Sequence, residues 1–92
     1  MAVNDLTFRQ TGKHYETEFV SEGKAVVQLV RPSESYNKRI VVYAHLEGLQ
    51  PSLVLDFYEA GENVIFELDI PQGVTVTIVS ETAVKQAKMS VV

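Results

Sequence analysis

Apolar and polar residues alternate along most of this chain, and this period of two constrains the fold more than any other feature of the sequence. Between residues 63 and 70, Val64, Phe66, Leu68 and Ile70 fall on one side of the alternation. Successive side chains of a β-strand point to opposite faces, so this pattern predicts strands with one buried face. The predicted strands span residues 14–20, 25–31, 40–46, 52–58, 63–70 and 74–79.

Turn-forming residues separate these segments and suggest how they connect. Residues 21–24 and 59–62 each contain a glycine and predict hairpins, and Pro71 with Gly73 matches a β-turn. Strands 52–58, 63–70 and 74–79 would then form a three-strand meander. The polar segment 31–38 is the longest loop candidate, and we expect it to carry the chain from one sheet to another. Residues 80–92 fit either a helix or a strand, and a strand is favoured.

These elements indicate a single all-β domain over residues 1–92. A chain of 92 residues has room for one core, and it contains no cysteine that could form a disulfide or a thiolate metal site. About seven short strands spaced by turns are typical of a small antiparallel β-sandwich, with a small β-barrel as the alternative. The uncharged, β-prone segment 74–79 should be a central strand or be covered by a partner chain, because such a segment pairs readily when left at an edge.

No segment suggests export or membrane insertion. The start of the chain lacks a basic stretch followed by an apolar one, and the apolar run at residues 40–46 is far shorter than the ~20 residues that a membrane span needs. A cytoplasmic or virion-associated setting is therefore favoured.

Charge is distributed unevenly along the chain. Residues 40–84 contain seven acidic and no basic residues, whereas the whole chain has a net charge of −4. Such a segment repels a phosphate backbone, so nucleic-acid binding is not expected. The acidic residues either keep the outer surface hydrated or meet basic residues of a second copy, for which Arg31, Lys38 and Arg39 are the candidates.

A second set of apolar residues lies on the side of the predicted strands that faces away from the core. These residues are Val41, Tyr43, Val54, Tyr58, Ile65 and Val79. A face that meets only water is usually more polar. We therefore expect them to form an interface, most simply between copies of the chain and otherwise with another protein subunit.

Motifs for catalysis, cofactors or metals are not found. His14 and His45 are the only histidines, and neither has ligands at a zinc-binding spacing nearby. Asp56, Glu59 and Glu62 lack the spacing of a calcium loop, and glycine-rich phosphate loops and the G-x-S-x-G motif are absent. The sequence predicts a non-enzymatic protein without cofactors.

Two hypotheses for function remain. The first is a structural or protein-interaction module that self-associates through an apolar sheet face and, by analogy of fold, serves as a building or decoration unit of a larger, phage-like assembly. The alternative is a small ligand-binding module resembling carbohydrate-binding β-sandwiches, with Tyr36 and Tyr58 as contact residues, because a tyrosine combines a flat ring with a polar tip.

Overall fold

The computed structural model describes residues 3–33 and 36–92, which form nine β-strands and no helix. The strands are β1 (Val3–Asp5), β2 (Arg9–Thr11), β3 (His14–Val20), β4 (Ala25–Val30), β5 (Lys38–His45), β6 (Ser52–Glu59), β7 (Asn63–Leu68), β8 (Thr75–Ser80) and β9 (Gln86–Val91). None of the described residues lies in a helix long and apolar enough to cross a lipid bilayer.

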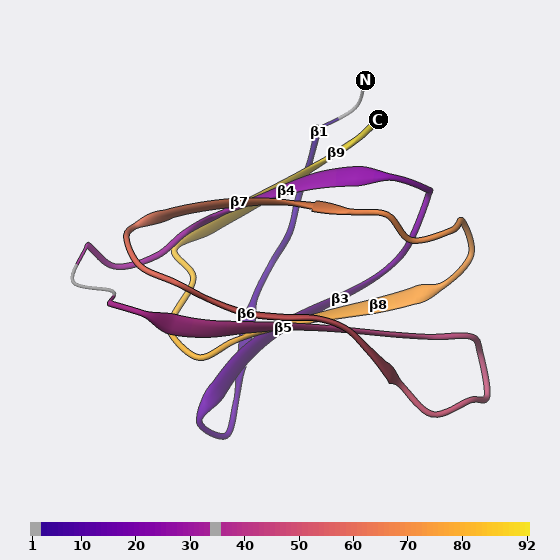
Figure 1. Ribbon diagram of the computed structural model, residues 1–92, viewed down its shortest axis with the longest axis horizontal. Helices are drawn as coiled ribbons and strands as arrows, with labels where there is room; N and C mark the ends of the chain where they lie inside the picture. Colours follow the sequence, from indigo (N-terminus) through magenta and orange to yellow (C-terminus); the bar gives the residue numbers. More distant parts are fainter. Residues whose placement is uncertain (1–2, 34–35) are drawn as a thin grey trace.

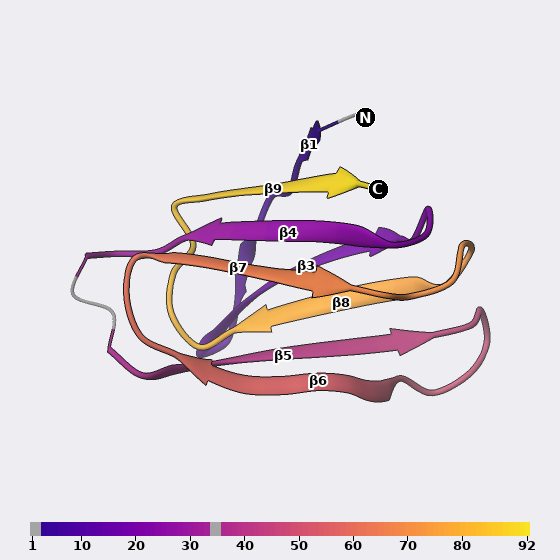
Figure 2. The same cartoon turned by 45° about the horizontal axis from the view of Figure 1, so that its top comes forward.

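Two antiparallel sheets pack face to face, which confirms the predicted β-sandwich. One sheet has four strands in the order β1-β9-β4-β7, and the other has five in the order β2-β3-β8-β5-β6. Figure 1 shows them as two layers, with β1 and β9 at the top of the view. When the top of the molecule is turned forward, the strands of each sheet are seen side by side, and β6 forms the lower edge of the five-stranded sheet (Figure 2).

Alternation places the core between the two layers. Val27 and Leu29 of β4 face inward from one sheet, and Ile40, Val76 and Ile78 face them from the other, all without exposed surface. Phe57 of β6 and Phe66 of β7 meet edge to face with ring centroids 5.3 Å apart. The buried apolar surface between the layers is the main source of stability in such a sandwich.

The predicted hairpins at residues 21–24 and 59–62 and the three-strand meander are wrong. β3 pairs with β2 and β8, and β4 pairs with β7 and β9, so the turn at residues 21–24 crosses between sheets. The segments at 59–62 and 69–74 also cross, because β6 and β8 belong to one sheet and β7 to the other. Alternation cannot separate these cases, since an inward-facing apolar row looks the same from either sheet.

Hydrogen bonds hold two of these crossovers side by side. The Ser21 amide donates to the Val74 carbonyl, and the Gly73 amide donates to the Ser21 carbonyl, each over 2.8 Å. The Ser21 hydroxyl also donates to the Ile70 carbonyl over 2.8 Å. A buried serine thus satisfies the backbone where both segments pass between the layers.

Other predictions from the sequence agree with the structure. The segment between β4 and β5 does carry the chain from one sheet to the other, as predicted, although its residues 34–35 lie outside the described part of the chain. Residues 86–91 form a strand rather than a helix, and β8 lies between β3 and β5 in the middle of its sheet. The expectation that the β-prone segment is central is confirmed.

Candidate functional site

A shallow depression of about 440 Å³ lies on the outer face of the five-stranded sheet. It arises because opposite residues of antiparallel strands point to the same face, and the register places Val41 opposite Val79 and Arg39 opposite Tyr58. Its lining combines apolar, aromatic and ionisable side chains from β3, β5, β6, β8 and the residue that follows β8. These are His14, Arg39, Val41, Tyr43, Tyr58, Val79 and Glu81.

Arg39 is held rigidly at this depression. Its Nε and Nη2 atoms donate to the two carboxylate oxygens of Asp56 over 2.8 and 2.6 Å, a bidentate arrangement that fixes the guanidinium plane. The hydrogen bonds and charge of Asp56 raise the pKa of Arg39, and the nearby Tyr58 and Tyr43 add smaller contributions in the same direction. The same hydrogen bonds lower the pKa of Asp56. Both groups are therefore charged across the ordinary pH range.

Glu81 joins the depression through the backbone of β5. Its Oε1 atom accepts a hydrogen bond from the Arg39 amide over 3.0 Å, and its own amide donates to the Arg39 carbonyl over 3.1 Å. These bonds extend the pairing of β5 with β8 beyond its last ladder residue. Glu81 thus supplies a second carboxylate beside Arg39, held by main-chain contacts.

Four of the six predicted interface residues gather here, but the six do not share one face. Val41, Tyr43, Tyr58 and Val79 line the depression, with Val41 only 6% exposed and Tyr58 56% exposed. Val54 lies where the register between β5 and β6 shifts, and Ile65 lies on β7 in the other sheet. The expectation of a common reverse face is wrong for Ile65, because β7 crosses to the four-stranded sheet.

The two predicted ligand residues are also separated. Tyr58 borders the depression, whereas Tyr36 lies in the segment between β4 and β5, is 77% exposed, and is not part of the lining. Their role in ligand binding stays a prediction.

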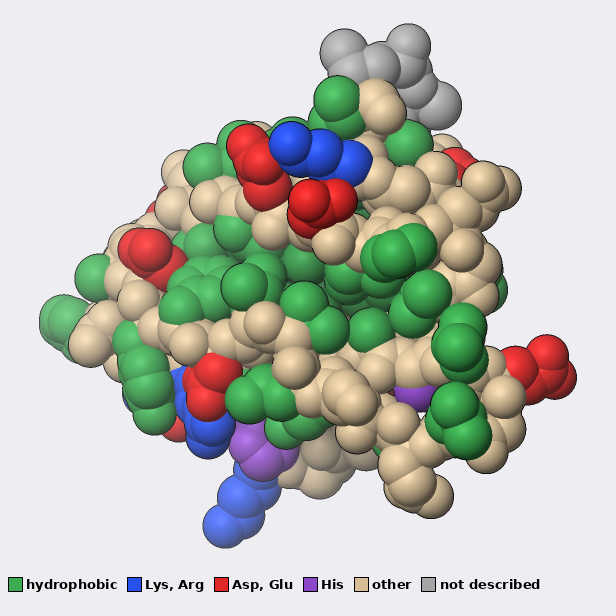
Figure 3. Space-filling model, turned by 45° about the vertical axis from the view of Figure 1, so that its right-hand side comes forward, with side chains coloured by type: hydrophobic (Ala, Val, Ile, Leu, Met, Phe, Trp, Pro, Cys, Tyr) green, Lys and Arg blue, Asp and Glu red, His purple; other side chains and the backbone are tan. Residues whose placement is uncertain are grey.

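A second surface feature lies along β6 and β7, the edge strands on one side of the sandwich. Exposed apolar side chains follow these edges and the loop between β5 and β6; they are Leu46, Leu49, Leu53, Val54 and Ile65, and we call this surface the open side. Figure 3 looks obliquely onto it and shows hydrophobic side chains gathered in the middle of the view, with acidic side chains around them. Sequence analysis did not single out Leu46, Leu49 and Leu53; the first two lie in the loop after β5, and Leu53 lies on the edge strand β6.

Acidic residues near the open side are matched by cations from the first part of the chain. Asp56 binds Arg39, and Lys24 Nζ lies 3.6 Å from Glu67 Oε2. Lys38 is directly opposite Glu59 in the β5–β6 register. The sequence therefore overstates the acidity of this region, since the fold brings basic residues from outside residues 40–84 to its carboxylates.

Arg31 has a role that the sequence did not reveal. It is fully buried just after β4, and its Nη2 atom donates to the carbonyls of Glu59 and Gly61, each over 2.8 Å. Burial lowers its pKa, and the charge of Glu59 partly opposes this effect. Its Nε and Nη1 atoms have no hydrogen-bond partner among the residues of the described chain. Arg31 is thus an internal anchor for the turn between β6 and β7, and it is not available to contact a second copy.

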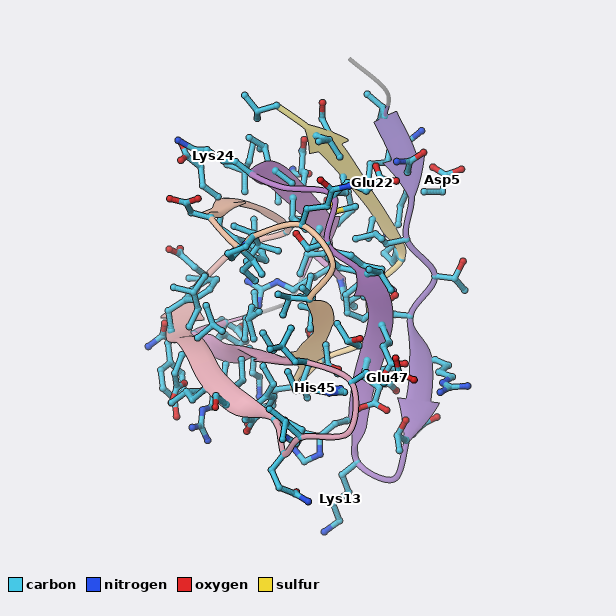
Figure 4. The ribbon with its side chains drawn as sticks, turned by 90° about the vertical axis from the view of Figure 1, so that its right-hand side faces the viewer. Asp5, Lys13, Glu22, Lys24, His45 and Glu47 are labelled. Atoms are coloured by element: carbon cyan, nitrogen blue, oxygen red, sulfur yellow. The ribbon has the colours of Figure 1, made fainter. Side chains whose placement is uncertain are left out.

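The two histidines lie in different parts of the five-stranded sheet. His14 borders the depression, while His45 lies at the end of β5 with Nδ1 3.1 Å from the Leu46 carbonyl oxygen. Within residues 3–33 and 36–92, no group of three or more histidine and acidic side chains is placed to hold a metal ion. In Figure 4, Asp5, Glu22 and Lys24 lie at one level of the molecule, His45 and Glu47 at another, and Lys13 extends from the bottom.

Comparison with known proteins reveals a likeness of fold alone. No protein-family model and no curated protein sequence matches the chain. Among solved structures, the chain is similar to part of a family GH115 4-O-methyl-α-glucuronidase, BtGH115A, with specificity for decorated arabinogalactans. The TM-score is 0.53 at 10% sequence identity, and the match covers 100% of this chain and 16% of that chain. This likeness shows that the same sandwich occurs as a small part of a much larger protein.

Proposed function

We propose that this protein is a non-enzymatic structural module that self-associates through its open side, with β6 of one copy pairing with β6 of another. The observation that carries the proposal is the coincidence of an unpaired edge with exposed apolar side chains. β6 is an eight-residue edge strand without proline or lysine, and its own residue Leu53 is 58% exposed. Natural edge strands normally carry such protective residues or are very short.

Charge supports a second copy as the partner. Two identical acidic surfaces would repel each other, but Asp56 and Glu67 each form an ion pair within their own chain, and Lys38 lies opposite Glu59 in the β5–β6 register. A two-fold pairing of open sides therefore brings together apolar side chains and largely neutralised ion pairs. Antiparallel pairing of β6 with its copy would extend each five-stranded sheet into a continuous one, as in other cases of strand addition.

The first test is the solution mass by light scattering at micromolar concentration. Wild type should be a dimer or larger, and Leu53→Lys should shift it to a folded monomer, because a lysine at the edge blocks pairing and buries a charge in the apolar contact. Val3→Lys is the matched control, since Val3 is an exposed apolar residue on the edge strand β1 at the other side. A monomeric wild type would refute self-association.

Hydrogen exchange separates strand pairing from other ways of using the same side. At concentrations where wild type is assembled, alternate amides of β6 should be protected, and dilution or Leu53→Lys should remove that protection. Assembly with fast exchange throughout β6 would leave self-association standing but would refute pairing through this strand.

A further inference from the structure

We infer that the depression on the five-stranded sheet is a binding site for a neutral saccharide. The depression lies on the sheet face, whereas the proposed pairing uses the backbone edge of β6, so the two surfaces adjoin at Asp56 and Tyr58 but use different atoms of β6. Saccharide binding therefore does not require self-association.

Size and lining suit a small ligand. Small-molecule sites commonly measure about 300–1,000 Å³ and combine apolar walls with a few polar groups. This depression measures about 440 Å³, with Val41 and Val79 as its apolar centre and Tyr43 and Tyr58 on neighbouring strands beside them. The C–H face of a sugar ring packs well on such aromatic and aliphatic surface, while the tyrosine hydroxyls remain able to hydrogen-bond.

The polar residues match hydroxyl groups, which both donate and accept hydrogen bonds. Glu81 supplies acceptors, Arg39 supplies donors, and His14 supplies both in its neutral form. Two hydrogen bonds to Asp56 fix Arg39 before any ligand arrives. This preorganisation reduces the entropy lost on binding.

Charge narrows the ligand class. Arg39 carries one positive charge, whereas Asp56 and Glu81 carry two negative charges, so the ionised groups around the depression disfavour an anionic sugar such as a uronate. A neutral saccharide avoids this repulsion.

Tyrosine fluorescence provides a direct binding measurement, because the chain has four tyrosines and no tryptophan. The probes are cellohexaose, xylohexaose, mannohexaose and a neutral β-1,3-galactan oligosaccharide, with polygalacturonate as the anionic comparison. At least one neutral probe should bind with a dissociation constant in the micromolar to millimolar range, and the amide NMR signals of β5, β6 and β8 around the depression should shift.

Tyrosine variants locate the site. Tyr43→Ala and Tyr58→Ala should each weaken binding by about tenfold or more, which corresponds to ~1.4 kcal/mol. Tyr36→Ala is the matched control, because Tyr36 is an exposed tyrosine outside the depression, and it should change affinity less than twofold. Circular dichroism and thermal unfolding verify that each variant is folded.

Three results would overturn the inference. The first is no binding of any neutral probe at millimolar concentration, and the second is tighter binding of polygalacturonate than of every neutral probe. The third is an affinity that survives in folded Tyr43→Ala and Tyr58→Ala variants or falls equally in Tyr36→Ala, since the ligand would then bind elsewhere.

Discussion

The edge strands on the two long sides of the sandwich differ in length. On one side, which we call the closed side, a single segment covering residues 3–11 supplies β1 to the four-stranded sheet and β2 to the five-stranded sheet, and both edge strands have three residues. On the open side, β6 and β7 end the sheets with eight and six residues. The edges of the closed side are short, and those of the open side are long.

The burial of apolar side chains also differs between the closed side and the open side. On the closed side, Leu6 and Phe8 lie between β1 and β2, pack against the core, and are partly buried. On the open side, Leu53 and Ile65 are 58% and 67% exposed. The contrast shows that Leu6 and Phe8 cover part of one side, whereas the side that we propose for self-association keeps large apolar side chains exposed along long edge strands.

The largest expected effect comes from uncovering the closed side. The double variant Leu6→Ala, Phe8→Ala removes two side chains that pack on the core where the chain passes between sheets. We expect the free energy of unfolding to fall by about 3–5 kcal/mol, because large-to-small changes lose buried area and leave cavities. Chemical denaturation measures this, and a loss below about 1 kcal/mol would mean that this segment is not part of the folded core.

Arg31→Ala tests the anchor at one end of the open side. It removes the guanidinium that binds the carbonyls of Glu59 and Gly61, and it leaves space where a fully buried side chain lay. We expect a loss of about 2–3 kcal/mol in unfolding free energy. Arg9→Ala, at an exposed arginine of β2, is the control and should change it by less than about 0.5 kcal/mol. Equal effects would show that Arg31 does not support the β6–β7 turn.

Lys38→Glu tests whether charge at the open side affects assembly. It places a carboxylate opposite Glu59 beside the open edge, so the assembled form should dissociate about three- to tenfold more readily at low salt, and added salt should reduce the difference. Lys13→Glu makes the same charge change at the tip of the β2–β3 turn and should leave assembly unaffected. Concentration-dependent sedimentation measures both. An equal effect of the two variants would point to net charge rather than to the open side.

The smallest expected effect is on the pH dependence of stability. Arg39 lowers the pKa of Asp56 in the folded protein, so this ion pair stabilises the fold above the unfolded-state pKa of about 4 and stops doing so as the pH falls through the lowered folded value. Asp56→Asn should therefore be slightly less stable than wild type at pH 7, and the difference should shrink as the pH falls below about 4. Because both groups are exposed, the difference at pH 7 should be small. A difference that does not shrink as the pH falls would exclude this ion pair as its source.

Local pattern predicted the strands better than their connections. The alternation around Val27, Leu29, Val76 and Ile78 identified strands and their buried faces, because burial of one face imposes a period of two on the sequence itself. The same alternation predicted hairpins at residues 21–24 and 59–62, where the chain crosses between sheets. A turn of a few residues is compatible with either connection, and only packing of the two layers decides between them.

Sequence also predicted the candidate site only in part. Sequence alone singled out Val41, Tyr43, Tyr58 and Val79 as residues facing away from the core, and the structure brings them together at one depression. Arg39, which lies beside these residues, contacts Asp56 and Glu81. These two residues are 17 and 42 positions from Arg39 in the chain, so no local spacing could reveal the contacts. Ile65 was expected on this face and lies on the other sheet because β7 crosses.

Sequence by itself determined that this chain forms an all-β domain, that most of its strands have one apolar face, and that segment 74–79 belongs in the middle of a sheet or beneath a partner chain. These properties follow from side-chain chemistry repeated along the backbone. Tertiary structure alone decided which strands became edges, which carboxylates were neutralised, and that Arg31 is buried. Each of these depends on contacts between residues far apart in the chain, and the free energy of those contacts is fixed only when the two sheets pack.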